Sequence, residues 1–272
     1  MDLNYQKDTN KKSPLKFFLL VYGLSLPFWL IEPFINIKGL PLDIPITDII
    51  AAFTPLFAAC ILTYKENDKD AVKNLLLKIF DYKVIKNKKW YFAVLGLPLL
   101  IFILIYLTLI ILKKDVSTIW HPSLIAIPIL FVFFFLGAVG EELGYTGYAV
   151  DPLLNKWNAL TTSIIIGLPW AIWHYPSIIQ QGHNFNWILW GTLGTVAMRI
   201  LIVWIYNNTN KSLFASILIH TFYNLGRPLF PKDNSHNPLV DYPGIHYTII
   251  ALVASVIVLS YGYKTLIRNE IK

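Results

Sequence analysis

Three pairs of polar residues lie inside apolar stretches of this sequence, where ionisable groups are costly and are therefore candidates for function. The pairs are Glu141 with Glu142, Trp170 with His174, and His220 with Asn224. Members of the second and third pairs are four residues apart, so in a helix each pair shares one face. The two glutamates are adjacent, so on a helix they point about 100° apart and their roles should differ.

Together these side chains could hydrolyse an amide bond. A partly buried carboxylate can take a proton from water, and a neighbouring imidazole can orient that water or share the proton. A second imidazole and an amide supply donors for the oxyanion that forms when a carbonyl is attacked. Each pair alone also has a structural interpretation: a helix leaving the membrane, an aromatic belt, or hydrogen bonding between helices. The three together favour acyl transfer to water.

The elements that must position these residues are membrane helices. The chain has 272 residues, of which 56% are hydrophobic and 14% charged, against roughly 45–50% and 25% in a typical soluble domain. An aromatic content of 15% excludes a disordered chain. The single cysteine, Cys60, excludes an internal disulfide and a Cys/His zinc cluster. The basic residues that give the net charge of +7 lie between the apolar runs, where they indicate which loops are cytoplasmic. They do not predict a nucleic-acid partner.

We expect an all-α fold, a polytopic membrane helix bundle of about eight transmembrane helices, because about 20 apolar residues cross a bilayer as helix. The candidate segments are residues 17–35, 46–64, 90–112, 122–148, 159–180, 185–206, 212–231 and 245–264. With the N-terminus inside, 17 of the 23 basic residues fall in cytoplasmic segments and five fall outside. This distribution indicates a multi-pass protein of the cell membrane with both termini in the cytoplasm.

The stretch 65–89 reads as a cytoplasmic amphipathic segment. Val72, Leu75, Leu76 and Ile79 recur at helical spacing in a lysine-rich stretch. Such a segment can lie on the anionic inner leaflet, and the alternative is a charged linker between two spans.

In this order on separate apolar spans, the three pairs resemble the motifs of the CPBP family. This family comprises the type II CAAX prenyl endopeptidases and the bacterial Abi proteins linked to bacteriocin self-immunity, and its motifs are EExxxR, FxxxH and HxxxN. The resemblance covers residues 122–231. The roles that it implies are general base for Glu141, water binding for His174, oxyanion donors for His220 and Asn224, and a supporting acid for Glu142.

Two positions depart from the family motifs. Trp170 stands in place of Phe and keeps an aromatic wall, whereas Thr146 stands in place of Arg. Loss of the arginine matters, because a guanidinium can pair with a carboxylate and fix it. Arg199 is the basic residue that lies deepest within a predicted span. The default expectation is that Arg199 snorkels to the headgroups; the alternative is that it pairs with the glutamates, whose depth it shares.

The sequence leaves the use of a metal open. Glu141, His174 and His220 could form a two-histidine, one-carboxylate zinc set with an open position. Against zinc, the sequence has no HExxH pair, and asparagine is a poor zinc ligand. We favour a metal-free glutamate mechanism over a metalloprotease, so the expected cofactor is none or Zn.

The predicted organisation has three regions. They are 1–121, N-terminal transmembrane helices with the amphipathic segment; 122–231, a CPBP-like catalytic core; and 232–272, a final transmembrane helix and a cytoplasmic tail. The expected function is an intramembrane endopeptidase that hydrolyses a peptide bond near the cytoplasmic membrane face. Its expected partners are a peptide or membrane-protein substrate and the lipid bilayer.

Two other functions compete with this hypothesis. One is a catalytically weak or silent membrane protein for immunity or regulation that binds a peptide or a membrane partner. Thr146 favours this alternative, whereas the intact catalytic set favours the enzyme. The other is a transporter, against which the lack of a detectable repeat argues.

Overall fold

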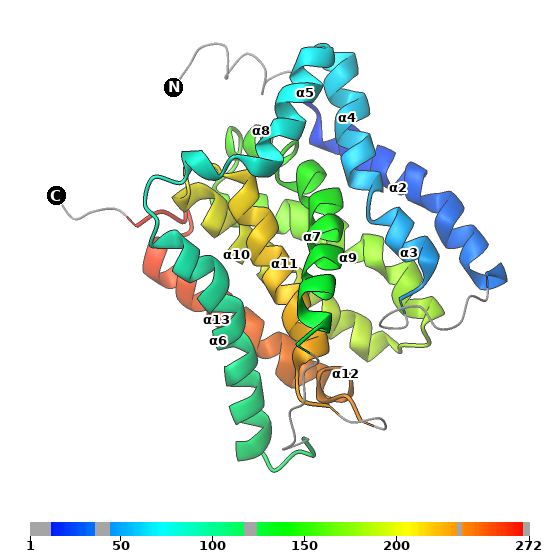
Figure 1. Ribbon diagram of the computed structural model, residues 1–272, viewed down its shortest axis with the longest axis vertical. Coiled ribbons are helices and arrows are strands. Elements are labelled where there is room, and N and C mark those ends of the chain that lie inside the picture. Colours follow the sequence, from blue (N-terminus) through cyan, green and yellow to red (C-terminus); the bar gives the residue numbers. More distant parts are fainter. Residues whose placement is uncertain (1–11, 36–43, 117–123, 233–235, 269–272) are drawn as a thin grey trace.

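The computed structural model describes residues 12–35, 44–116, 124–232 and 236–268, and these residues form helices without any strand (Figure 1). The long helices are α2 (Pro14–Ile31), α4 (Thr54–Glu66), α6 (Trp90–Ile111), α7 (Ala126–Tyr145), α9 (Ala159–Gln180), α10 (Phe185–Asn208), α11 (Leu213–Leu229) and α13 (Pro243–Tyr261). The short helices are α3 (Ile46–Ala51), α5 (Lys69–Leu77), α8 (Val150–Leu154) and α12 (Pro238–Asp241), with 3₁₀ turns at Glu32–Phe34, Lys78–Phe80 and Tyr82–Val84. The predicted all-α fold is confirmed.

Within the described residues, six helical segments are long and apolar enough to cross a membrane. They are Pro14–Phe34, Ile46–Glu66, Trp90–Ile111, Ala126–Leu154, Phe185–Asn208 and Pro243–Tyr261. The other two predicted spans form α9 and α11, the helices that carry the second and third polar pairs. Eight spans therefore remains a prediction, and the predicted cytoplasmic ends, residues 1–11 and 269–272, lie outside the described residues.

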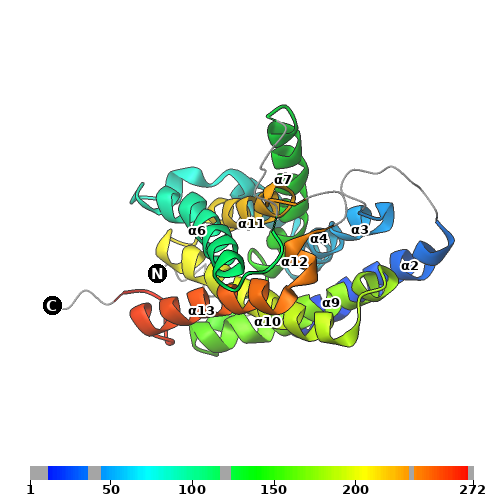
Figure 2. The same cartoon turned by 90° about the horizontal axis from the view of Figure 1, so that it is seen from below.

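The long helices form two layers of four (Figure 2). One layer holds α13, α10, α9 and α2, each packed against the next; the other holds α6, α11, α7 and α4 in the same way. Contacts of α10 with α11, of α2 with α4 and of α13 with α6 join the layers. Of the helices that carry the three polar pairs, α7 and α11 are therefore neighbours in one layer, and α9 lies in the other layer between α10 and α2.

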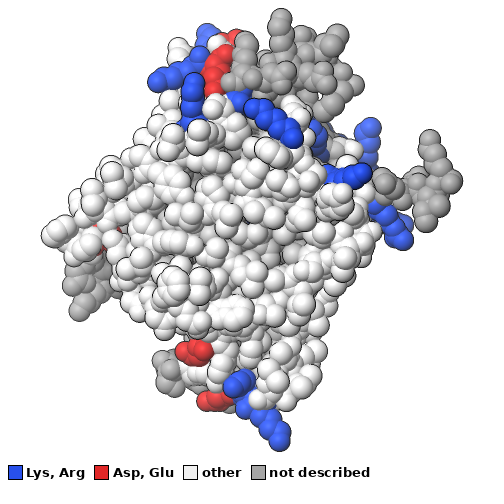
Figure 3. All heavy atoms as spheres, turned by 180° about the vertical axis from the view of Figure 1, so that it is seen from behind, with Lys and Arg blue, Asp and Glu red and all other residues white. Residues whose placement is uncertain are grey.

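The surface agrees with a membrane environment. Figure 3 shows a broad uncharged face, with lysines and arginines gathered mainly at one end of the molecule and a smaller mixed group of charges at the other. Helix α6 presents Phe92, Leu99 and Ile111 outward, each more than half exposed. Large apolar side chains that face outward on a long helix are favourable in lipid.

Helices α9, α10 and α11 begin at side chains that accept hydrogen bonds from their first free N–H groups. Asn158 caps α9 and Asn184 caps α10. The start of α11 is bound more tightly, because the carboxylate of Asp81 accepts from the Ser212 hydroxyl at 2.6 Å and from the backbone N–H of Leu213 at 3.0 Å. A carboxylate at a helix N-terminus also complements the helix dipole.

This contact fixes the predicted amphipathic segment against the bundle. The segment forms α5 and the two 3₁₀ turns that follow it, as its spacing predicts, and Leu75 is buried whereas Leu77 and Phe80 are exposed beside the lysines. The segment therefore crosses the end of the helix that carries His220 and Asn224. No observation here tests its contact with lipid, which stays a prediction.

Glycines allow α4 to approach α7 closely. A Cβ atom at Gly144 would lie 2.5 Å from the carbonyl oxygen of Pro55 and 2.8 Å from the ring of Phe17. A Cβ atom at Gly140 would lie 2.5 Å from the carbonyl oxygen of Ala52. Neither distance is compatible with a side chain, so the backbone contact of α4 with α7 depends on glycine at both positions. This contact covers the part of α7 that holds the two glutamates.

Candidate active site

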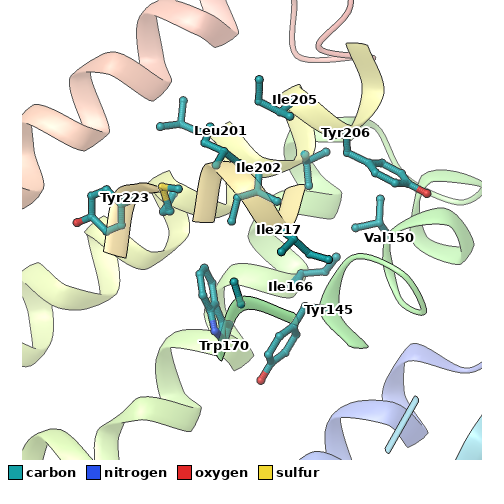
Figure 4. Packing of buried hydrophobic residues seen from close by; sticks show 14 of the residues in the cluster. Tyr145, Val150, Ile166, Trp170, Leu201, Ile202, Ile205, Tyr206, Ile217 and Tyr223 are labelled. Carbon is teal, nitrogen blue, oxygen red and sulfur yellow. The ribbon is translucent and has the colours of Figure 1, made fainter. Parts of the chain in front are cut away.

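The last two turns of α7 are enclosed by the surrounding helices. Residues 138–145 are all buried, and among them Glu142 has no exposed surface and Glu141 only 8%. In Figure 4 the rings of Tyr145 and Trp170 lie side by side below the aliphatic residues of the core, with their polar atoms pointing away from those residues. The Trp170 N–H, which donates to Glu141, thus points away from the packed apolar core.

The carboxylate of Glu142 accepts four hydrogen bonds. Its Oε1 accepts from Arg199 Nη2 at 3.0 Å and from His220 Nδ1 at 2.9 Å. Its Oε2 accepts from Arg199 Nη1 at 2.7 Å and from the Thr146 hydroxyl. A carboxylate offers about four lone-pair sites, so these donors occupy the accepting capacity of Glu142. Glu142 has no free position for a water molecule and instead holds the groups around it.

The carboxylate of Glu141 has a different environment. Its Oε2 accepts a hydrogen bond from Trp170 Nε1 at 2.5 Å, and no other described residue donates to it. Its Oε1 accepts no hydrogen bond from the described residues and is not fully buried, so solvent can reach it. Of the two glutamates, Glu141 is therefore the one that can bind a water molecule and take its proton.

The tautomers of both histidines follow from their partners. His174 Nδ1 lies 2.8 Å from the backbone oxygen of Trp170, and His220 Nδ1 lies 2.9 Å from the Glu142 carboxylate. Carbonyl and carboxylate oxygens only accept, so each Nδ1 carries a hydrogen and donates it. The Nε2 atom of each ring is left for substrate or water.

Trp170 contacts both histidines and Glu141. Its ring centroid lies 5.3 Å from that of His220 and 5.8 Å from that of His174, in edge-on geometry. Its N–H is the donor to Glu141. The sequence predicts only an aromatic wall at this position. A phenylalanine would provide that wall but has no N–H to donate.

Arg199 is fully buried, so the expectation that it snorkels to the headgroups is wrong. Both of its terminal nitrogens bind Glu142, Nη1 also donates to Thr146 Oγ1 at 3.1 Å, and its guanidinium carbon lies 4.2 Å from the Trp170 ring centroid. Bidentate pairing and stacking hold the guanidinium at Glu142, although its buried Nε has no hydrogen-bond partner among the described residues. The alternative expectation, pairing with the glutamates, is what the structure has.

Asn224 has no direct contact with the glutamates through a hydrogen bond. It follows His220 by one turn on α11 and is half-buried, and its amide makes no hydrogen bond to the described residues. The amide atoms are also not fully buried, so solvent can reach them. It is therefore free to donate to a bound group.

Two groups near the site were not singled out from the sequence. Tyr145 lies one turn after Glu141, and its buried ring is 6.0 Å from that of Trp170. Asp48 accepts a hydrogen bond from Ser177, which is three residues after His174 on α9, and its charge is within electrostatic reach of His174. The i, i+4 spacing from Glu141 could have identified Tyr145. Asp48 comes from another helix, so no spacing rule could have found it.

The proposed zinc ligands are not assembled. Across the described part of the chain, no three His, Cys, Asp or Glu side chains are grouped so that they could hold one metal ion. His220 turns its Nδ1 to Glu142, and Glu141 binds Trp170. The residues present do not fit a zinc site formed by Glu141, His174 and His220.

The fold and the site together define a membrane helix bundle that encloses two glutamates and two histidines. Comparison with known proteins agrees with this class. Residues 122–226 match the family model described as type II CAAX prenyl endopeptidase, Rce1-like. The matched segment contains all three motifs, which confirms the resemblance predicted from them.

A similarity to a curated protein extends over nearly the whole chain. The chain is 26% identical over 265 residues to CAAX prenyl protease 2 of Methanococcus maripaludis, an alignment that covers 92% of this chain and 94% of that protein. Both findings support an intramembrane endopeptidase. Neither bears on the link to Abi proteins and bacteriocin immunity, which stays a prediction.

Proposed function

We propose that this chain hydrolyses a peptide bond near the cytoplasmic face of the membrane, with Glu141 as the general base. The observation that carries the proposal is the contrast between the two glutamates. Four donors occupy Glu142, whereas Glu141 keeps an oxygen that solvent can reach. A binding scaffold would need no free carboxylate among two histidines inside a membrane.

The reaction follows from these free atoms. Glu141 Oε1 takes a proton from water, which His174 Nε2 helps to hold, and the water oxygen attacks the carbonyl carbon of the peptide bond. The Asn224 amide and an Nε2–H of His220 donate to the oxyanion. In this step His220 is doubly protonated, with its Nδ1–H held by Glu142. As the C–N bond breaks, protonated Glu141 returns its proton to the leaving amine.

The proposed substrate is a peptide or protein with a prenylated cysteine near its C-terminus. The support is the match to the type II CAAX prenyl endopeptidase family model and the similarity to a CAAX prenyl protease. A C-a-a-X terminus is the signal for attachment of a prenyl group, and an isoprenoid chain partitions into lipid. A site inside the membrane would meet such a substrate where its lipid resides.

The test is cleavage of a farnesylated C-a-a-X peptide by the full-length chain in detergent or nanodiscs, followed by mass spectrometry. We expect cleavage on the C-terminal side of the modified cysteine and little cleavage of the same peptide without the farnesyl group. Equal cleavage of both peptides would contradict the prenylated substrate class. Activity should also persist in a metal chelator, and complete, zinc-reversible loss would contradict the metal-free mechanism.

The second candidate is a catalytically weak or silent membrane protein for immunity or regulation, and Thr146 in place of arginine is the observation that favours it. Binding of the farnesylated peptide with no cleavage over a wide range of pH would support this candidate. Efficient turnover that requires Glu141 would exclude it.

We further propose that both termini are cytoplasmic and that the chain crosses the cell membrane eight times. The distribution of lysine and arginine supports this topology. Reporter fusions after Lys89 and after Lys272 should both read as cytoplasmic. Opposite readings at the two positions would contradict the even number of spans.

A further inference from the structure

Both departures from the family motifs contact the same side chain. Thr146 Oγ1 lies 3.1 Å from Arg199 Nη1, and the Trp170 ring centroid lies 4.2 Å from the Arg199 guanidinium carbon. These residues come from three helices, α7, α9 and α10. Two unusual residues that meet on one buried cation indicate a joint arrangement.

The space at position 146 is suited to a small hydroxyl and not to a second cation. Thr146 has no exposed surface, and its hydroxyl donates to Glu142 Oε2 while accepting from Arg199. An arginine at 146 would bring a second guanidinium to a carboxylate that already binds one through two bonds. Like charges this close in a buried site repel strongly. Threonine at 146 is thus the residue that accommodates Arg199.

We propose that Arg199 is a positioning residue of this site, which supplies from α10 the guanidinium that position 146 lacks. Arg199 binds Glu142 directly, and Glu142 in turn holds Nδ1 of His220. The chain of contacts fixes the ring whose Nε2 faces the substrate. The ion pair of Glu142 is therefore relocated to Arg199, Thr146 bonds to both of its members, and threonine at this position is no sign of lost catalysis.

Arg199 also fixes the second glutamate through Trp170. Its guanidinium lies over the Trp170 ring, which in turn donates its N–H to Glu141 Oε2. An arginine stacked on an indole restricts the ring through cation–π attraction. Phenylalanine at 170 would keep the stacking and lose the donor. Arg199 thus orients both carboxylates, one by an ion pair and one through an aromatic ring.

The experiment is a double-mutant cycle in the full-length protein, with Arg199→Met, Thr146→Arg and both together. The two measurements are thermal unfolding in detergent, and kcat and KM for the farnesylated peptide. Arg227→Met is the matched control, because Arg227 is exposed at the end of α11 that lies beyond Asn224. Arg199→Lys keeps the charge but loses the fork that matches a carboxylate.

We expect Arg199→Met to lower kcat by about 10²-fold with little change in KM, because the variant loses positioning and not substrate contacts. Adding Thr146→Arg should restore at least about tenfold in kcat and part of the unfolding temperature, whereas Thr146→Arg alone should lower both. Arg199→Lys should lie between wild type and Arg199→Met. Losses that simply add in the double variant would overturn the proposal, as would full activity of Arg199→Met.

The rate measurement rests on the proposed function, but the unfolding measurement does not. If the wild-type chain cleaves no prenylated peptide, a non-additive change in unfolding temperature still supports the relocated pair while the proposed function fails. If Arg199→Met does not fold, Arg199→Met with Glu142→Leu removes both charges of the ion pair and should fold. That variant should be inactive, and wild-type kcat in it would overturn the positioning role.

Discussion

The two halves of helix α7 have the same backbone and opposite surroundings. In the first half, Ile129, Val132 and Leu136 are each at least half exposed, and the sequence carries no charge. In the second half, residues 138–145 are all buried and include both glutamates. One continuous helix therefore passes from a lipid-like environment into a protein interior. Helix α4 packs against α7 through glycine where the glutamates lie.

The difference shows what a carboxylate requires at membrane depth. Lipid tails are as apolar as leucine, so the first half needs no precise packing. In the second half every carboxylate oxygen without a donor would be costly. The structure meets that cost at Glu142 with four donors and leaves one oxygen of Glu141 open. Substitutions should consequently be tolerated in the first half and have large, specific effects in the second.

The largest expected effect is that of Glu141→Gln. The amide has nearly the same shape, but its oxygen is too weak a base to take a proton from water, so we expect proteolysis to fall by about 10³-fold or more. The measurement is the rate of cleavage of the farnesylated peptide, with thermal unfolding as the check on folding. Full activity in a well-folded Glu141→Gln chain would exclude the proposed mechanism.

His220→Ala and Asn224→Ala should each reduce kcat by about 10²–10³-fold if both groups stabilise the oxyanion. Their stabilities should differ. His220→Ala removes a donor from Glu142 and should lower the unfolding temperature, whereas Asn224 has no hydrogen bond to a described residue to lose. Unchanged kcat in Asn224→Ala would remove that amide from the mechanism.

A pair of glycine substitutions compares the two halves directly. A methyl group at Gly144 would meet the carbonyl oxygen of Pro55, whereas nothing lies within 4 Å of one at Gly137. We expect Gly144→Ala to destabilise the protein by about 1–3 kcal/mol through overpacking. Gly137→Ala should be neutral or stabilise by up to about 1 kcal/mol, as alanine favours helix. Similar unfolding temperatures for both variants would contradict the contrast.

The sequence predicts the helices well because their signal is local. Apolar runs of about 20 residues give the segments, and each of the eight predicted segments contains a long helix in the structure. The four-residue spacings also place His174 one turn beyond Trp170 on α9 and Asn224 one turn beyond His220 on α11. These features depend on residues close together along the chain.

The partners of the site residues could not be predicted in the same way. The pairing of Arg199 with Glu142 joins residues 57 apart, and the bond of Trp170 to Glu141 joins residues 29 apart. Depth along each helix placed Arg199 and the glutamates at one level but could not choose between pairing and snorkelling. That choice depends on which helix faces which, and lipid-facing and protein-facing helices have equally apolar sequences. The four hydrogen bonds to the Glu142 carboxylate likewise depend on the three-dimensional arrangement and could not be predicted from the sequence.

The smallest expected effect is that of Tyr145→Phe. This substitution removes the side-chain hydroxyl in the buried half of α7, and the exposed half has no such hydroxyl. The rings of the first half belong to phenylalanines, whereas Tyr145 lies one turn from Glu141, and its hydroxyl makes no hydrogen bond to the described residues. Tyr145→Phe keeps the ring contacts with Trp170 and Phe17. If the hydroxyl donates to water held by Glu141, its loss should lower kcat about three- to tenfold, the size expected for one neutral hydrogen bond.

Tyr148→Phe is the matched control for Tyr145→Phe. The Tyr148 hydroxyl donates to the Glu66 carboxylate at 2.8 Å and accepts from the Ser13 N–H, so it ties α4 and the start of α2 to the turn after α7. Its removal should lower the unfolding temperature and leave kcat unchanged. The opposite pattern is expected for Tyr145→Phe. If Tyr145→Phe changes stability alone, its hydroxyl belongs to the packing of α7 against α2 and α9, and the water at Glu141 is held by the histidine without it.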